Sequence, residues 1–376
     1  MKNIYIFSSH APSLINFRGP MLKTLVEKGN FVKTFAPPCK NIKILEKKLK
    51  SIGVSFETYP ISSSHLSFIK DLITLKNIYY ILKNNNIDIL MAYTHKPVVF
   101  CGLLVKYFSK ISFYPMITGL GYGFIKDNEF KIKRFIFNKT LIQLLRSSLK
   151  NAKNIIFQNN DDKFLFKKLN ILKKNQISKV INGSGVDLKL YQRTKIPKKP
   201  IFLMVSRLLV DKGVREYVES ARIVKLKYPN VIFKLIGESD HNPSSISIGE
   251  LNDWIKNDYI KYSKYSNNIS KELDKCRFFV LPSYREGMPR SVLEALAKGR
   301  PIITTNTAGC KETVIDGYNG HLVPIQNSKS LANAMIKLLA CDNSKIDILG
   351  DRSYKLARLK FDVRKINKDI INILKL

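Results

Sequence analysis

The sequence predicts an α/β protein made of two doubly wound domains in tandem. Three observations support this prediction. Short apolar runs alternate with longer amphipathic segments in both halves of the 376-residue chain. A stretch rich in proline and lysine, residues 192–200, separates the two halves. The length also suits two or three domains, because one domain holds roughly 100–200 residues.

The first half predicts a parallel sheet covered by helices, because its strands are short and helical patterns lie between them. Strands are expected at residues 3–9, 31–36, 87–93 and 111–117, and helices at residues 20–29, 41–53 and 98–108. Gly29 and Gly53 stand where two of these helices should end. We assign residues 1–191 to an N-terminal domain.

The second half repeats the alternation. Strands are expected at residues 201–206, 231–237, 259–263, 278–282 and 301–306, with helices at residues 214–228 and 290–299. We assign residues 201–360 to a C-terminal, ligand-binding domain and residues 361–376 to a final helix, a candidate to pack back on the N-terminal domain. Ligands of such sheets bind beyond the carboxyl ends of the strands, so two facing domains would form a cleft there.

The charge is strongly positive. Lysine and arginine total 64 against 29 acidic residues, a formal charge of +35, which predicts anionic partners such as phosphorylated metabolites, an anionic membrane surface or nucleic acid. The alternative is compositional drift that leaves many lysines simply solvated. No nucleic-acid-binding motif is evident and the cations are dispersed, so no nucleic-acid partner is expected.

The location follows from cysteines and hydropathy. The five cysteines are odd in number and none is paired at metal-site spacing, as expected for free thiols in a reducing cytoplasm. The N-terminal apolar run is too short for a secretory signal, and no apolar stretch approaches the roughly 18 residues of a spanning helix. We expect a soluble protein or one attached at a membrane surface.

A first candidate site follows the strand at residues 201–206. Arg207 and Lys212 lie between that strand and the next helix. Two cations there suit a diphosphate, because a helix N-terminus adds amide donors and a favourable dipole. The alternative is two surface cations in a basic protein.

A second candidate site is the pair of glutamates in "SYREGMPRSVLEALAKGRPII". Glu286 lies in a loop and Glu294 about one turn into a helix that begins near Arg290. The turn between them consists of Gly287, Met288 and Pro289. Carboxylates accept hydrogen bonds from paired hydroxyls, so one could hold a sugar and the other a ribose. The alternative is a surface Glu286 and a Glu294 paired with a helix lysine.

Residues 205–324, from "VSRLLVDKG" through "EGMPRSVLEALAKGRPIITTNTAGCKETVIDGYNGHLVP", closely resemble retaining glycosyltransferases of family 4, which have the GT-B fold of two Rossmann-like domains. The N-terminal half is similar more loosely, and the resemblance implies that residues 1–191 bind the acceptor and residues 201–360 bind the nucleotide sugar. The resemblance implies transfer of a sugar from a nucleotide diphosphate sugar with retention at the anomeric carbon. It implies that Arg207 and Lys212 bind the diphosphate, that Glu294 holds the ribose and that Glu286 contacts the donor sugar. The backbone of Gly287, Met288 and Pro289 would lie beside diphosphate and sugar.

The resemblance also assigns residues in the N-terminal half. Gly19 would lie near the donor phosphates, although family members often carry two adjacent glycines where this chain has Arg18-Gly19. His95 matches a family histidine near the reacting sugar, and its alternative is a structural histidine. The implied catalytic set is therefore His95, Glu286, Arg207 and Lys212. No Asp-x-Asp motif ends a strand, so we expect neither a metal nor a cofactor, with the cations stabilising the leaving group.

The acceptor is indicated by a basic segment. The segment from Lys126 to Lys153 contains eight cations and two acids, interleaved with aromatic and aliphatic residues. This pattern is typical of helices at membrane surfaces. Lys131, Lys133 and Arg134 are its candidate membrane or acceptor contacts; the alternative is a core-packed helix with a solvated cationic face.

"DKGVREYVESA" and "ESDHNPSS" resemble bacterial transferases that extend glycans on undecaprenyl diphosphate, including the N-acetylgalactosaminyltransferase that acts after bacillosamine in protein N-glycan assembly. That likeness implies a UDP-sugar donor such as UDP-N-acetylgalactosamine, a lipid-linked glycan acceptor and peripheral attachment at the cytoplasmic face of the inner membrane. An epimerase of sugar nucleotides with the same architecture is the alternative, and a nucleic-acid-binding protein is less favoured.

Overall fold

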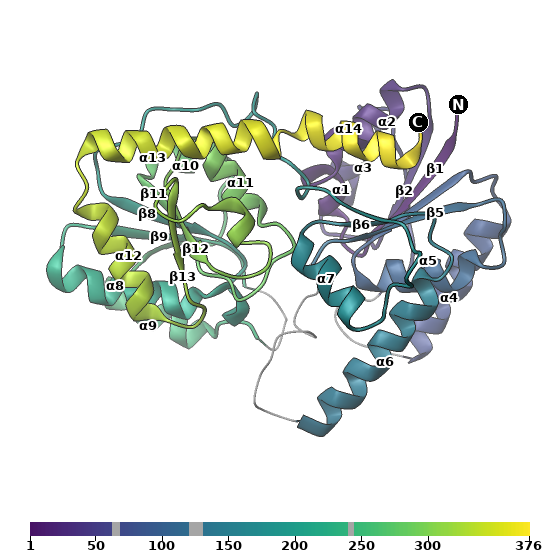
Figure 1. The fold of residues 1–376 in the computed structure, drawn as a ribbon, viewed down its shortest axis with the longest axis horizontal. Helices are drawn as coiled ribbons and strands as arrows, with labels where there is room; N and C mark the ends of the chain where they lie inside the picture. Colours follow the sequence, from purple (N-terminus) through teal and green to yellow (C-terminus); the bar gives the residue numbers. More distant parts are fainter. Residues whose placement is uncertain (62–67, 120–130, 240–243) are drawn as a thin grey trace. The chain divides into compact units, whose positions relative to one another are not determined.

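The computed structural model describes residues 1–61, 68–119, 131–239 and 244–376, with residues 131–138 described by their backbone alone. The chain forms two compact units (Figure 1). Unit 1 comprises residues 1–184 and 363–376, and unit 2 comprises residues 185–362. Each unit contains one parallel sheet with helices packed on it.

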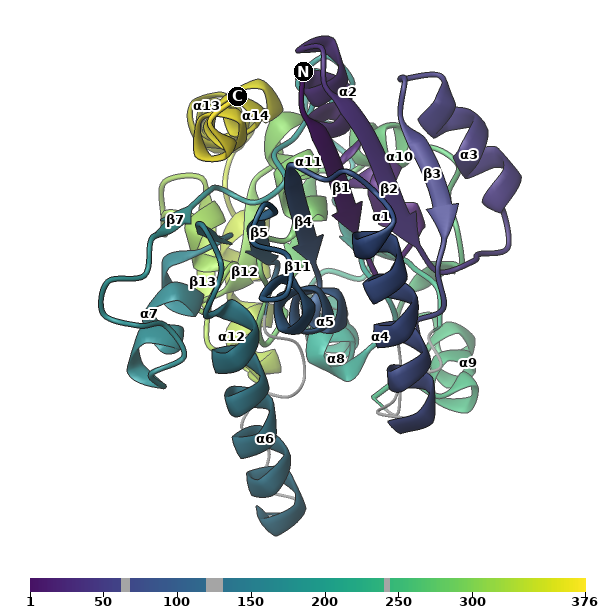
Figure 2. The ribbon, with the colours of Figure 1, turned by 90° about the vertical axis from the view of Figure 1, so that its right-hand side faces the viewer.

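Unit 1 has a seven-stranded sheet in the order β3-β2-β1-β4-β5-β6-β7, whose strands lie side by side in Figure 2. The strands are β1 (Asn3–Phe7), β2 (Phe31–Ala36), β3 (Ser55–Thr58), β4 (Ile89–Tyr93), β5 (Ser112–Ile117), β6 (Ile155–Phe157) and β7 (Ser178–Val180). The helices are α1 (Pro12–Asn16), α2 (Gly19–Glu27), α3 (Ile42–Lys50), α4 (Phe68–Lys83), α5 (His95–Val105), α6 (Lys131–Leu149), α7 (Asn160–Lys168) and α14 (Val363–Leu374).

Each face of this sheet has its own core, because successive strand residues point to opposite sides. Tyr5 and Phe7 belong to a core closed by α4, α5 and α6, and α5 lies between the other two helices (Figures 1 and 2). Ile4 and Ile6 belong to the opposite core, which α2 and α14 close. The last helix is thus part of unit 1, where Asn367 Nδ2 donates to Thr24 Oγ1 over 3.1 Å.

Unit 2 has a six-stranded sheet in the order β10-β9-β8-β11-β12-β13. Its strands are β8 (Ile201–Val205), β9 (Ile232–Ile236), β10 (Lys261–Ser263), β11 (Phe278–Leu281), β12 (Ile302–Thr305) and β13 (Gly320–Val323). Its helices are α8 (Val214–Lys227), α9 (Ile248–Lys256), α10 (Ile269–Lys275), α11 (Arg290–Ala297), α12 (Ser328–Leu339) and α13 (Asn343–Leu356), and the π-helical turn η4 (Ala357–Phe361) follows them. The expected tandem of doubly wound domains is confirmed.

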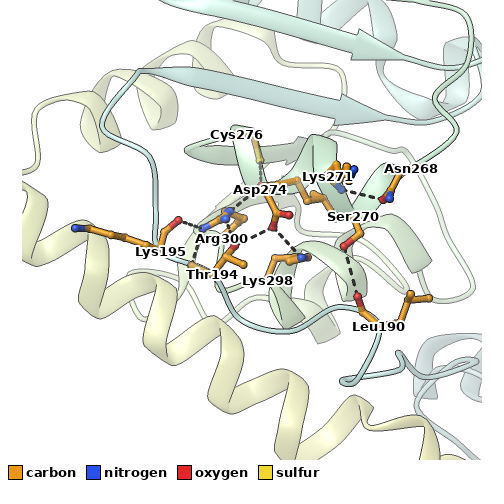
Figure 3. Close-up of polar contacts among 11 residues, drawn as sticks. Leu190, Thr194, Lys195, Asn268, Ser270, Lys271, Asp274, Cys276, Lys298 and Arg300 are labelled. Carbon is orange, nitrogen blue, oxygen red and sulfur yellow. Dashed lines mark hydrogen bonds and ion pairs between the residues drawn. The ribbon is translucent and has the colours of Figure 1, made fainter.

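The division between the units differs from the predicted one. Residues 185–200, including the predicted linker, belong to unit 2, as do the first two residues of the predicted C-terminal helix. The side chain of Arg300 is fully buried and donates to the carbonyl oxygen of Thr194 over 3.1 Å and to its Oγ1 over 2.6 Å (Figure 3). Asp274 accepts from the same hydroxyl at 2.9 Å and from Lys298 Nζ at 2.7 Å. Residues 192–200 therefore resemble a linker in the sequence, but the buried Arg300 holds them on unit 2.

Candidate functional site

The carboxyl ends of β8 and β11 bring two loops of unit 2 together. After β8, the turn η2 (Val210–Lys212) leads to Gly213, whose φ of +73° is left-handed. A Cβ on Gly213 would lie 2.2 Å from the carbonyl oxygen of Pro282, so only glycine lets the two loops approach this closely. The approach places Lys212 beside the loop that carries Glu286.

Lys212 and Glu286 form the centre of the site. Lys212 Nζ lies 2.6 Å from Glu286 Oε1, and the Ser283 hydroxyl donates to the same oxygen over 2.9 Å. The two charged side chains are only 16% and 15% exposed. These bonds fix the orientation of the Glu286 carboxylate, because Lys212 comes from the loop after β8 and Ser283 from the loop after β11.

The loop of Glu286 is also held from the β12 side. Thr305 Oγ1 donates to the Ser283 carbonyl oxygen, and Thr307 Oγ1 donates to the Tyr284 carbonyl oxygen over 2.9 Å. The Glu286 amide donates to the Ala308 carbonyl oxygen over 3.0 Å. Gly309 has φ +80°, and a Cβ there would lie 2.4 Å from the Glu286 carbonyl oxygen. A second left-handed glycine thus packs the loop after β12 against the loop of Glu286.

Glu294 lies on α11 and is nearly buried, with 8% of its surface exposed. Arg290 Nε, one turn earlier, donates to Glu294 Oε1 over 2.8 Å. The Tyr191 hydroxyl also bonds to the Glu294 and Arg290 side chains; burial first, and the Glu294 carboxylate second, raise the pKa of Tyr191. Glu294 therefore pairs with a helix arginine, where the alternative interpretation expected a lysine.

The structure brings several of the predicted residues together in unit 2. Lys212 and Glu286 touch, Gly287, Met288 and Pro289 are buried in the turn that follows, and α11 begins at Arg290 as expected. Arg207 lies exposed in the loop after β8. The sequence interpretation did not assign Ser283, Tyr191 or Gly309 to the site. Ser283 and Gly309 lie inside the quoted motifs, whereas Tyr191 lies just before the predicted linker and no pattern marks it.

Two predicted residues lie at the carboxyl edge of the unit 1 sheet. His95 begins α5 directly after Thr94, whose φ of +69° is an outlier for a β-branched residue. Thr94 Oγ1 lies 2.7 Å from Ser9 Oγ, which helps to hold this backbone, and strain of this kind often accompanies functional sites. Gly19 begins α2, and a Cβ there would meet nothing within 4 Å, so the fold of unit 1 does not itself demand glycine at this position.

The predicted membrane contacts Lys131, Lys133 and Arg134 fall in the first turn of α6, where their side chains lie outside the described residues. Within the ranges that the structure describes, no helix has the length and apolarity needed to cross a membrane.

Known proteins of similar sequence include several glycosyltransferases. A family model described as glycosyl transferases group 1 matches residues 186–355. A Campylobacter jejuni protein named N,N'-diacetylbacillosaminyl-diphospho-undecaprenol alpha-1,3-N-acetylgalactosaminyltransferase is 33% identical over 363 residues, covering 91% of each chain. An Escherichia coli protein named UDP-Gal:alpha-D-GlcNAc-diphosphoundecaprenol alpha-1,3-galactosyltransferase is 25% identical, covering 77% of this chain and 76% of that one.

Solved structures agree with the fold. Sucrose-phosphate synthase from Thermosynechococcus elongatus superposes with a TM-score of 0.82 at 18% identity, covering 100% of this chain and 98% of that chain. Anabaena Alr3699/HepE, solved in complex with UDP, superposes with a TM-score of 0.77 at 18% identity, covering both chains completely. At this identity the likeness bears on the fold alone.

Proposed function

Because the chain belongs to the glycosyl transferases group 1 and is a glycosyltransferase of GT-B fold, we propose that it moves a sugar from a UDP-sugar to a glycan on undecaprenyl diphosphate. We propose N-acetylgalactosamine as the sugar and retention at its anomeric carbon. The names of the two bacterial relatives support the lipid-linked acceptor, since both specify an undecaprenol diphosphate. Family membership favours transfer over the epimerase alternative.

The contact between Lys212 and Glu286 carries this proposal. A cation suited to phosphate and a carboxylate suited to hydroxyls, held 2.6 Å apart, fit a ligand whose anionic and hydroxyl groups are adjacent. The bond between a diphosphate and a sugar has that character. Lys212, with Arg207 on the same loop, would bind the diphosphate, and Glu286 would accept from hydroxyls of the sugar.

The same residues suit the chemistry. The bond from the anomeric carbon to the phosphate oxygen breaks, a bond to the acceptor oxygen forms, and the acceptor proton is released as UDP departs. Negative charge grows on the departing oxygen, where fixed cations stabilise the transition state more than the ground state. This is also why we propose that no divalent metal is needed.

Glu294 would hold the ribose. Arg290 donates to its carboxylate and Tyr191 interacts with it, and such contacts give a binding carboxylate the fixed orientation it needs. In unit 1, the strained Thr94 supports a role for His95 near the reacting sugar, and the open space at Gly19 is compatible with a phosphate close to the start of α2.

We further propose that the enzyme works while attached to the surface of the inner membrane, on its cytoplasmic face. Lys131, Lys133 and Arg134 remain candidate contacts. Changing all three to glutamate should lower transfer to a lipid-linked acceptor and leave the binding of UDP intact.

The test is a thermal-shift screen against nucleotide sugars, followed by a transfer assay. A ligand at 100 times its dissociation constant raises the free energy of unfolding by about 2.7 kcal/mol, so UDP-N-acetylgalactosamine should shift the melting temperature clearly and ADP-glucose should not. UDP should then appear only when a lipid-linked acceptor is added. Isomerisation of the donor without an acceptor would instead support the epimerase alternative.

A further inference from the structure

Helix α4 exposes an unusual amount of apolar surface. Its buried side consists of Thr74, Ile78 and Leu82. On the other side Phe68, Ile69, Leu72, Ile73, Tyr79 and Tyr80 are 80%, 71%, 49%, 52%, 36% and 48% exposed. A helix on the surface of a soluble domain normally turns polar residues to water, and a contiguous exposed apolar patch marks an interaction site.

These residues form one stripe. Ile69, Leu72, Ile73, Tyr79 and Tyr80 share one face of the helix, because they are related by spacings of three, four and seven residues. The stripe continues past the end of α5, where the Phe108 ring lies 5.7 Å from that of Tyr79 and Tyr107 is 66% exposed. We name the six exposed apolar residues of α4 together with Tyr107 the α4 surface.

The charge around the α4 surface is positive. The lysines Lys70, Lys76, Lys83, Lys106 and Lys110 surround it, all exposed. Two of them lie over its aromatic rings, Lys76 at 6.0 Å from the centroid of Tyr80 and Lys106 at 4.8 Å from that of Tyr107. The single acid of α4, Asp71, is neutralised by Lys96 at 2.8 Å, with both side chains more than four-fifths buried. No carboxylate of the helix therefore offsets the lysines.

An exposed apolar stripe with lysines beside it favours an anionic lipid surface as the binding partner. Aliphatic residues and tyrosines on one face, with lysines beside them, are typical of helices that lie in the headgroup region of a bilayer. A second copy of the chain would oppose one cationic surface with another, which like charges disfavour. A surface of anionic lipid complements both the charge and the apolar stripe.

We propose that the α4 surface docks this enzyme on an anionic lipid bilayer, with its apolar side chains among the headgroups and its lysines on lipid phosphates. The proposal rests on the proposed function, in which the acceptor is linked to lipid, and adds a second surface to the predicted contacts on α6. Docking would also orient the carboxyl edge of the unit 1 sheet, where His95 lies, relative to the membrane. Asp71 in the first turn of α4 is ion-paired with Lys96, the residue next to His95, so the same end of the unit would face the headgroups.

The test is co-sedimentation with vesicles of phosphatidylglycerol and phosphatidylcholine, and with vesicles of phosphatidylcholine alone. The variant Ile69→Gln/Leu72→Gln/Ile73→Gln changes only side chains that are 49–71% exposed, so it should fold. We expect its partition onto the anionic vesicles to fall at least tenfold, because each lost side chain withdraws apolar area from the membrane. The matched control is Leu226→Gln/Ile248→Gln/Ile255→Gln, which changes three exposed apolar side chains on α8 and α9 of unit 2 and should partition like the wild type.

A charge variant separates the contribution of the lysines to vesicle binding from that of the apolar side chains. Lys70→Gln/Lys76→Gln/Lys83→Gln should weaken binding to anionic vesicles and have little effect on vesicles of phosphatidylcholine alone, and about 0.5 M salt should mimic it. If the apolar variant sediments like the wild type, the proposal is overturned. It is equally overturned if the wild type does not sediment and the apolar variant converts a dimer to a monomer, since a second copy then covers the surface.

The proposed function is read out separately, by the shift in melting temperature with UDP-N-acetylgalactosamine and by transfer to a short-chain, water-soluble acceptor diphosphate. Vesicle binding without either signal would refute the proposed function and leave the docking surface standing. Transfer to the soluble acceptor without vesicle binding would refute the docking surface alone.

Discussion

Replacing Lys212 with alanine tests the centre of the site, because it removes the cation that contacts Glu286. The Glu286 carboxylate would keep only the Ser283 hydroxyl on Oε1, at a position where 15% of its side chain is exposed. Losing a hydrogen bond to a charged group costs about 1.5–3 kcal/mol of unfolding free energy, and both partners are buried enough for most of that cost to appear. If Lys212 also stabilises the departing diphosphate, kcat/KM should fall by roughly 100-fold or more.

The stability effect and the catalytic effect can be separated with a second change. Adding Glu286→Gln to Lys212→Ala removes the unpaired charge, so the free energy of unfolding in urea should recover. Activity should not recover, because the diphosphate would still lack its cation. Arg222→Ala is the control, since it breaks the exposed ion pair with Glu219 on α8 and should alter neither measurement.

The decisive measurement is kcat/KM from steady-state UDP release. A folded Lys212→Ala enzyme with the turnover of the wild type would refute the assignment of Lys212 to the diphosphate. Recovery of turnover in the double variant would show instead that Lys212 acts only by neutralising Glu286.

Three other changes test the remaining site and fold. Glu294→Gln should weaken the binding of UDP about tenfold by calorimetry, whereas Glu286→Gln should lower transfer more than UDP affinity; equal UDP affinity for wild type and Glu294→Gln would argue against the ribose role. Exhaustive EDTA treatment should leave transfer intact, and activity restored specifically by magnesium or manganese would contradict the metal-free proposal. Arg300→Leu should lower the free energy of unfolding by about 3 kcal/mol in urea, because Thr194 and Asp274 lose the network around the buried guanidinium; an unchanged midpoint would contradict this.

The sequence predicted most of the apolar strands, but it missed β6 (Ile155–Phe157) and β13 (Gly320–Val323). The expected strand at residues 31–36 matches β2, and the expected strand at residues 301–306 contains β12. Gly29 and Gly53 have the left-handed backbone expected at helix ends, with φ of 78° and 75°. The short strands β3 and β7 had no such signal, since each has few apolar residues and lies at a sheet edge.

The residues of the candidate site could be proposed from the sequence, but their geometry could not. Lys212 and Glu286 are far apart in sequence, and they meet because β8 and β11 are neighbours in the sheet and because Gly213 and Gly309 adopt left-handed conformations. The support from Tyr191 was not predictable either, because the short polar stretch that follows it resembles a linker. The structure shows that residues 185–200 belong to unit 2, where the buried Arg300 bonds to Thr194 and Arg277 Nη1 donates to the Pro197 carbonyl oxygen over 2.8 Å.

Helix α4 shows why an element can escape a periodicity argument for a reason that matters to function. Helix prediction from one sequence looks for apolar residues on one side and polar residues on the other. In "FIKDLITLKNIYYILK" the buried side and the exposed side are both apolar, so the contrast that marks an amphipathic helix is weak. The same property leaves an apolar stripe with lysines around it once Thr74, Ile78 and Leu82 have packed on the sheet. The weak signal in the sequence and the exposed surface in the structure therefore have one cause, which is that this helix has two apolar environments to satisfy and unit 1 supplies only one.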